Sequence, residues 1–138
     1  MILTKRLSID TKGQGDVRDV TAEVGQIVAD SRLEAGAATV FVVGSTAGVT
    51  TLEFESGVVA DLDHAFEQIA PRRAAYEHHR RWGDDNGSSH VRAAMLGPSL
   101  TIPFEERRLL LGTWQQIVVA EFDTGARRRE LVVQVIGE

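Results

Sequence analysis

The sequence contains no cysteine, and no apolar run approaches the ~20 residues that a membrane-spanning helix needs. Without cysteine, the protein has no disulfides, no thiolate metal ligands and no cysteine nucleophile. The N-terminal segment Met1–Arg6 also lacks the apolar stretch of a signal peptide. We therefore expect a cytoplasmic protein with no membrane partner.

Positive charge is also scarce, because the net charge at pH 7 is −5. This balance argues against general nucleic-acid binding. Of the 15 basic residues, 13 are arginines, and many occur in pairs or triplets. The planar fork of arginine suits phosphate and carboxylate groups. Solvated ion pairs at the ends of helices and strands explain the same clusters equally well.

A length of 138 residues suits one domain, residues 1–138, which can bury about two-thirds of the surface of the unfolded chain. Apolar residues at helical spacing predict helices over 21–35 and 57–70. We expect Thr21 to cap the first helix, Gly36 to end it and Pro71 to end the second. A short helix is expected over 90–96.

Apolar runs rich in β-branched residues predict strands separated by turn residues. We expect these strands over 3–9, 39–43, 49–54, 99–104, 109–122 and 130–136. The run at 39–43 is continuous, which is typical of a strand covered on both faces. The last three strands predict an antiparallel meander. The order of elements predicts an α+β fold with mainly antiparallel sheet, two main helices and one short helix.

A polar loop over 76–90 holds the first candidate site, with His78, His90, Asp85 and Asn86. Two neutral imidazoles and one carboxylate can bind a divalent metal such as zinc and leave a position for water. The alternative is a solvated loop whose histidines serve only in hydrogen bonding.

Two further groups interrupt strands with polar residues. The segment 44–48, Gly-Ser-Thr-Ala-Gly, offers the hydroxyls of Ser45 and Thr46 together with free backbone N–H groups, a combination that can hold phosphate. Glu53 follows and is either an inward-facing carboxylate that needs a partner or an edge-strand group in water. Trp114 and Gln115 either line a pocket or pack conventionally.

Together these motifs resemble the YjbQ-type family, small proteins described as secondary thiamine-phosphate synthases. The resemblance covers the chain from about residue 1 to its end in a constant motif order. It rests on Ser45-Thr46-Ala47 with Glu53, Tyr76-Glu77-His78, Asp85-Asn86 with Ser89-His90, Met95-Leu96-Gly97-Pro98-Ser99 and Gly112-Thr113-Trp114-Gln115.

The resemblance implies an antiparallel α+β fold, a homotrimer, and a metal site near a subunit boundary. It also implies a side activity that makes thiamine phosphate from a pyrimidine pyrophosphate and a thiazole phosphate. By motif, His78 and His90 match the metal-type histidines, Glu53 the family glutamate and Gln115 the pocket glutamine. Much of that family has a histidine where this chain has Gly44. Either Glu53, Asp85 or water completes the metal shell, or this branch has changed its metal or lost its chemistry.

The leading hypothesis is therefore an enzyme-like protein that binds a small phosphorylated molecule and a divalent metal such as zinc. Its residues are Glu53 and Gln115 for catalysis and His78, His90 and Asp85 for the metal. Ligand contacts come from Ser45, Thr46, Asn86, Arg92 and Trp114. The alternative is a non-catalytic small-ligand or metal-binding homotrimer. A third reading makes the histidines packing groups at a subunit interface.

Overall fold

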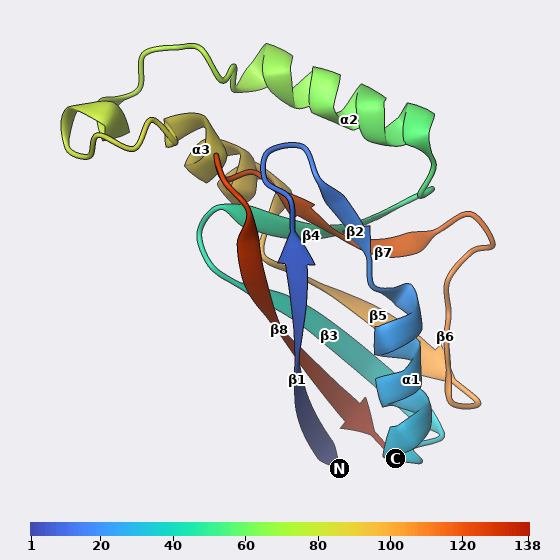
Figure 1. Cartoon of the computed structure of the whole chain (residues 1–138). Coiled ribbons are helices and arrows are strands. Elements are labelled where there is room, and N and C mark those ends of the chain that lie inside the picture. The colour runs from blue at the N-terminus through green and yellow to red at the C-terminus, as the bar shows by residue number, and fades with distance from the viewer.

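The computed structural model describes all 138 residues as two antiparallel sheets with helices packed against them (Figure 1). The larger sheet has the strand order β1-β8-β3-β5-β6 and the smaller one the order β2-β7-β4. In chain order the elements are β1 (Ile2–Thr11), β2 (Val17–Asp19), α1 (Thr21–Ser31), β3 (Ala35–Val43), β4 (Ala47–Leu52), α2 (Ser56–Ile69), the 3-10 helix η1 (Glu77–Arg80), α3 (Gly87–Leu96), β5 (Ser99–Glu105), β6 (Arg108–Leu109), β7 (Gln116–Glu121) and β8 (Arg127–Gly137). The predicted α+β class is confirmed.

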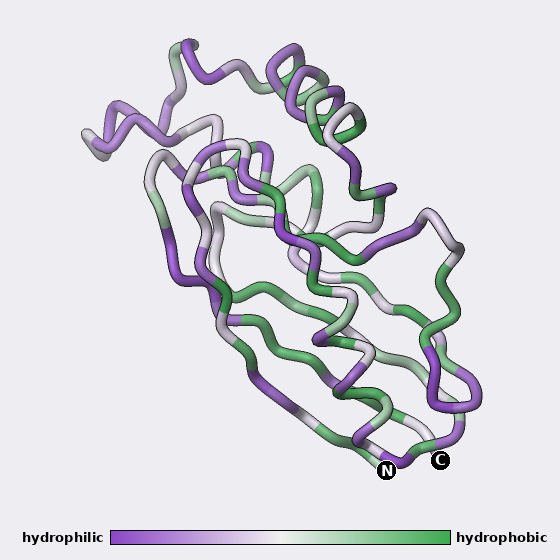
Figure 2. Tube along the Cα trace, turned by 45° about the vertical axis from the view of Figure 1, so that its right-hand side comes forward, coloured by the Kyte–Doolittle hydropathy of each residue, from purple (hydrophilic) through white to green (hydrophobic).

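The main core lies between α1, one face of the five-stranded sheet and one face of the three-stranded sheet. Val24 and Val28 of α1 are fully buried against the sheets. The strand residues that they pack against are every second residue, because successive side chains of a strand point to opposite faces of the sheet. Figure 2 shows this apolar centre in green, and the loop around η1 in purple. A second, smaller cluster joins the helices α2 and α3 to the small sheet through Phe66, Ala93, Ala120 and Phe122.

The first helix is shorter than its apolar pattern predicts, and the assignment of its end to Gly36 is wrong. Arg32 adopts the left-handed conformation (φ 61°) and its N–H bonds to the carbonyl of Ala29. Gly36 instead lies within β3, where a Cβ would stand 2.0 Å from the carbonyl oxygen of Ile136. Close strand pairing, and not helix capping, accounts for this glycine.

The expectation that residues 39–43 are covered on both faces is wrong for the single chain. Val40 and Val42 are buried, but Phe41 and Val43 point to the open face of the five-stranded sheet and are 41% and 44% exposed. The strand that is buried on both faces is β7, which lies between the main core and the α2–α3 cluster.

The predicted meander of the last three strands is also wrong. Strand β5 pairs with the short β6, but the chain then leaves this sheet near Gly112 and becomes the central strand β7 of the smaller sheet. Strand β8 returns to the larger sheet between β1 and β3. The predicted run 109–122 was therefore two strands in different sheets.

No helix has both the length and the apolar character that crossing a membrane would require.

Candidate functional site

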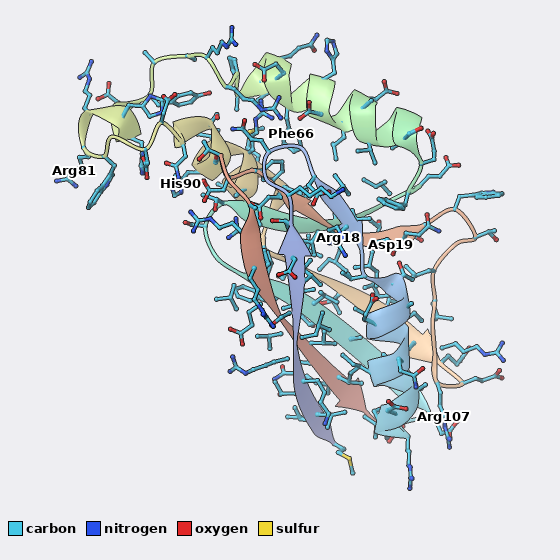
Figure 3. The ribbon with its side chains drawn as sticks, in the orientation of Figure 1. Arg18, Asp19, Phe66, Arg81, His90 and Arg107 are labelled. Carbon is cyan, nitrogen blue, oxygen red and sulfur yellow. The ribbon has the colours of Figure 1, made fainter.

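His78 and His90 lie against each other, although they are twelve positions apart in the sequence. Their ring centroids are 4.5 Å apart and the rings are inclined by 41°. His78 belongs to η1, and His90 lies in the first turn of α3, where Figure 3 labels it. The Nδ1 atom of His78 is buried without a hydrogen-bond partner, and the Asp84 carboxylate lies 3.7 Å away. The loop therefore does fold back to form a histidine pair.

His79 has a different task from its neighbour. Its Nε2 accepts a hydrogen bond from the backbone N–H of Gly87 at 3.0 Å, and its Nδ1 lies 3.2 Å from the carboxylate of Asp85. These partners assign the proton to Nδ1. His79 thus holds the start of α3 in place. Asp85, whose φ is +56°, is directed at His79 and not at the histidine pair.

The donors of one chain do not make a complete metal site. Catalytic zinc usually has three protein ligands and an open position. The His78–His90 pair supplies two imidazoles, and no group of three or more His, Asp or Glu side chains is arranged so that it could hold a metal ion. The residues of a single chain therefore do not fit the metal that the resemblance implies.

Beside His90 lies a pocket of about 250 Å³, closed by the turn between β3 and β4. The backbone N–H groups of Gly44, Ser45 and Thr46 have no acceptor within the chain, and Ser45 is exposed. The remaining walls are small or apolar: Ala47, Ala93, Ala94 and Pro98. The turn thus combines unpaired backbone N–H groups with two residues, Gly44 and Ser45, that line a small cavity.

Behind this turn, charged side chains form a buried network. Arg129 donates from Nε to Glu121 Oε1 at 2.8 Å and from Nη2 to Glu121 Oε2, and also from Nη2 to Thr46 Oγ1 at 2.7 Å. Thr46 in turn donates to Asp123 Oδ2 at 2.9 Å, and Asn86 donates to Asp123 Oδ1 at 3.4 Å. The hydroxyl of Thr46 and the amide of Asn86 therefore serve this network, although both were predicted to contact ligand.

Both carboxylates of the network stay ionised. Burial would raise the pKa of Asp123, but hydrogen bonds from the Thr124 N–H, Thr46, Asn86 and Arg127 outweigh it and lower this pKa to about 2. Burial likewise opposes ionisation of Glu121, yet hydrogen bonds from Arg129 and Thr11 hold its pKa below the ordinary value. The network thus pairs two anions with the cations Arg127 and Arg129.

Arg92 was predicted to contact the ligand, but its guanidinium binds other residues of the chain. Its side chain is 2% exposed, Nε donates to the carbonyl of Ala70 at 3.0 Å and Nη2 to Glu67 Oε2 at 2.7 Å. A hydrogen bond from the backbone N–H of Arg72 lowers the pKa of Glu67. Burial opposes this effect, and the guanidinium of Arg92 lowers the pKa further. Arg92 therefore ties α3 to the end of α2.

Gln115, Trp114 and Glu53 lie at the other end of β4. Gln115 Nε2 donates to Thr51 Oγ1 at 3.2 Å, and Trp114 is 72% exposed. Glu53 is exposed just beyond the strand. The histidine pocket contacts Ala47, so the length of β4, roughly 17 Å, separates the two groups. One chain therefore does not bring all the predicted residues together.

Residue-type motifs missed Glu121, Asp123 and Arg129, although the sequence contains a signal for them. Arg129 lies an even number of residues from Leu131, Val133 and Val135 of β8, so its side chain is on the same face of the strand as these core residues. Glu121 directly follows a run of buried apolar residues in β7. Charged residues at inward positions of strands need partners, so this periodicity predicts a buried ion pair.

Fold and site together define an α+β protein of two packed antiparallel sheets, with a small pocket beside His90. The family model described as "UPF0047 protein YjbQ-like" matches residues 5–138. The chain belongs to this family. It is 34% identical over 137 residues to a UPF0047 protein of Methanothermobacter thermautotrophicus, with 99% of this chain and 94% of that protein covered. It is 30% identical over 136 residues to the UPF0047 protein YugU of Bacillus subtilis, with 98% and 100% covered.

The fold is also similar to a crystal structure of a YbjQ-like protein of unknown function from Sulfolobus solfataricus. That comparison has a TM-score of 0.89 and 28% sequence identity, and it covers all of both chains.

Proposed function

We propose that this protein binds a small phosphorylated molecule in the pocket between His90 and the turn at Gly44–Ser45, and that it has a thiamine-phosphate-synthase-like secondary activity. The observation that carries the binding proposal is a 250 Å³ pocket lined by His90 and by Gly44 and Ser45, whose backbone N–H groups are unpaired; His78 lies against His90. The lining contains no carboxylate, which favours an anionic ligand over a cation.

The proposed chemistry is the transfer of a pyrimidine group from its pyrophosphate ester to a thiazole phosphate. The bond to pyrophosphate breaks as the new bond to the thiazole nitrogen forms, so negative charge develops on the leaving oxygen. Preorganised N–H donors stabilise such a charge most effectively where water is excluded. In this proposal the turn supplies the N–H donors, and His78 and His90 donate hydrogen bonds to the departing group. Such charged substrates suit a protein of the cytoplasm.

We further propose that three copies assemble and that adjacent copies share each site. Phe41, Val43 and Ile136 are large apolar residues exposed on the same open face of the five-stranded sheet, which is typical of a surface covered by another subunit. The length of β4 between His90 and Gln115 supports a second source for the catalytic residues. In this arrangement the Trp114–Gln115 end of one copy meets the histidine pocket of the next.

The test combines mass measurement with subunit mixing. Light scattering should give about three times the chain mass of 15.1 kDa. The variants His90→Ala and Gln115→Ala should each lose formation of thiamine phosphate, and a refolded mixture of the two should regain part of it, because some mixed sites carry neither change. A mixture as inactive as its components would contradict a shared site.

The alternative is a non-catalytic ligand-binding homotrimer. The separation of Glu53 and Gln115 from the histidine pair is the observation that favours it. Calorimetry with the pyrimidine pyrophosphate distinguishes the two functions. Binding that His90→Ala abolishes, with no product formed by the wild type, supports the alternative. Absence of binding to any phosphorylated compound contradicts both.

A further inference from the structure

Arg129 has one donor group that the protein leaves unused. Its Nε and Nη2 bind Glu121 and Thr46, but Nη1 has no hydrogen-bond acceptor in the chain. The side chain is only 8% exposed. Nη1 is not among the buried side-chain atoms that lack a partner, so this donor is open to the outside of the chain. A ligand acceptor can therefore form a charge-assisted hydrogen bond with Nη1.

The position of Nη1 depends on the glycine at position 44. Gly44 lies across from Arg129, one step beyond the last β3–β8 pair, Val43 and Glu130. A Cβ on Gly44 would stand 2.7 Å from Nη1, and the φ of +141° belongs to a region that favours glycine. The guanidinium thus occupies the space that any side chain at residue 44 would need.

Gly44 also lines the pocket beside His90, so Nη1 of Arg129 lies next to one wall of that pocket, although Arg129 itself is not a lining residue. The free N–H groups of Gly44 and Ser45 and the exposed hydroxyl of Ser45 lie in the same turn. Behind the turn, Glu121 and Asp123 balance the charges of Arg127 and Arg129. An anion here would therefore be held by directed N–H donors and not by a net positive charge.

We propose that Arg129 Nη1 and the backbone N–H groups of Gly44 and Ser45 together bind a phosphoryl group of the ligand. This inference rests on the proposed function, because it identifies which atoms of the pocket recognise the phosphorylated molecule. It assigns a ligand contact to Arg129, a residue that otherwise serves the buried network. It also gives Gly44 a role, since a side chain there would block the phosphoryl position.

The test is a titration of the full chain with inorganic phosphate, followed by amide and arginine side-chain NMR. We expect saturable shifts at the amides of Gly44 and Ser45 and at Arg129. Ala94 is exposed and lines the pocket, so Ala94→Glu places a negative charge beside the site, whereas Ala94→Gln is the neutral control of similar size. The glutamate should weaken phosphate binding about tenfold, and the glutamine should change it less than about twofold.

A second pair of variants addresses residue 44 directly. Gly44→Ala should abolish the shifts at Arg129, while Gly83→Ala, where a Cβ meets no atom within 4 Å, should leave them unchanged. If Gly44→Ala does not fold, the comparison at Ala94 still decides.

Shifts confined to His78 and His90 would overturn the role of Arg129 and leave the proposed function standing. Absence of any shift in the wild type would overturn both. Equal binding by Ala94→Glu and Ala94→Gln would also overturn this inference, because the phosphate would then lie elsewhere.

Discussion

The guanidinium of Arg129 donates to both carboxylate oxygens of Glu121 at a place where neither side chain is more than 8% exposed. This pair joins β8 of the larger sheet to β7 of the smaller one. Because Thr46 and Thr11 bind the same two side chains, the pair also fixes the turn that closes the pocket and the end of β1. The buried ion pair therefore links the fold directly to the candidate site.

Removal of one partner of this pair should destabilise the protein strongly. Arg129→Met leaves the Glu121 carboxylate buried without its main donor, and loss of one partner from a buried pair costs about 3–5 kcal/mol. Urea denaturation measures the change in the free energy of unfolding. Arg128→Met is the matched control, because Arg128 is exposed on the adjacent position of β8. A loss no greater than that of the control would show that the pair contributes little.

Acid should weaken the fold through Asp123. Its folded-state pKa of about 2 lies below the ordinary value of 3.8, so the ionised form is favoured by folding. The resulting stability is fully present above about pH 4 and is lost as the pH falls from 3.8 toward 2. Denaturation midpoints measured across this window should fall with pH in the wild type and fall less steeply in Asp123→Asn.

The control for this pH dependence is Asp61→Asn, which removes an exposed carboxylate of α2 that makes no hydrogen bond. Its pH profile should follow that of the wild type. The lowered pKa of Glu121 acts in the same direction, so Asp123→Asn should retain part of the slope. A profile for Asp123→Asn as steep as the wild-type profile would contradict the role of Asp123.

His79 should stabilise the first turn of α3, because it accepts a hydrogen bond from the Gly87 N–H. His79→Phe keeps an aromatic ring beside Tyr76 but removes the acceptor for the Gly87 N–H. Loss of an acceptor for a buried donor costs about 1–3 kcal/mol. Hydrogen exchange at the Gly87 amide should therefore become faster. His64→Phe is the control on α2, where the ring contacts only Gln68 by a side-chain hydrogen bond. Unchanged exchange in His79→Phe would mean that His79 does not hold the helix.

Local patterns predicted most of the elements, because helical spacing and β-branched runs reflect burial along a single segment. The helix α2 and the strand β1 are found close to their predicted positions. The partners of β7 depend on a change of sheet near Gly112, and no local pattern carries that information. The same limit explains why the end of the first helix was misassigned to Gly36.

The candidate site was predictable only in part for a related reason. Residue type identified His78 and His90, whose side chains do come together. Residue type cannot tell a ligand contact from a structural partner, so Arg92 and Asn86 were given ligand roles that their hydrogen bonds to Glu67 and Asp123 do not support. The position of Arg129 on β8 would have predicted its structural role, because alternation along the strand places this charged residue on the same face as the buried apolar residues.

Metal content tests the remaining part of the candidate site. The chain supplies two neighbouring imidazoles and no third side-chain donor, so we expect purified, untagged protein to hold far less than one divalent ion per chain by elemental analysis. The double variant His78→Ala/His90→Ala should give the same low value, and chelator treatment should leave the thermal midpoint unchanged. His64→Ala is the control for nonspecific binding to an exposed histidine. Near-stoichiometric zinc that the double variant loses would contradict this expectation. It would show that a second copy or a bound ligand completes the shell that a single chain leaves unfinished.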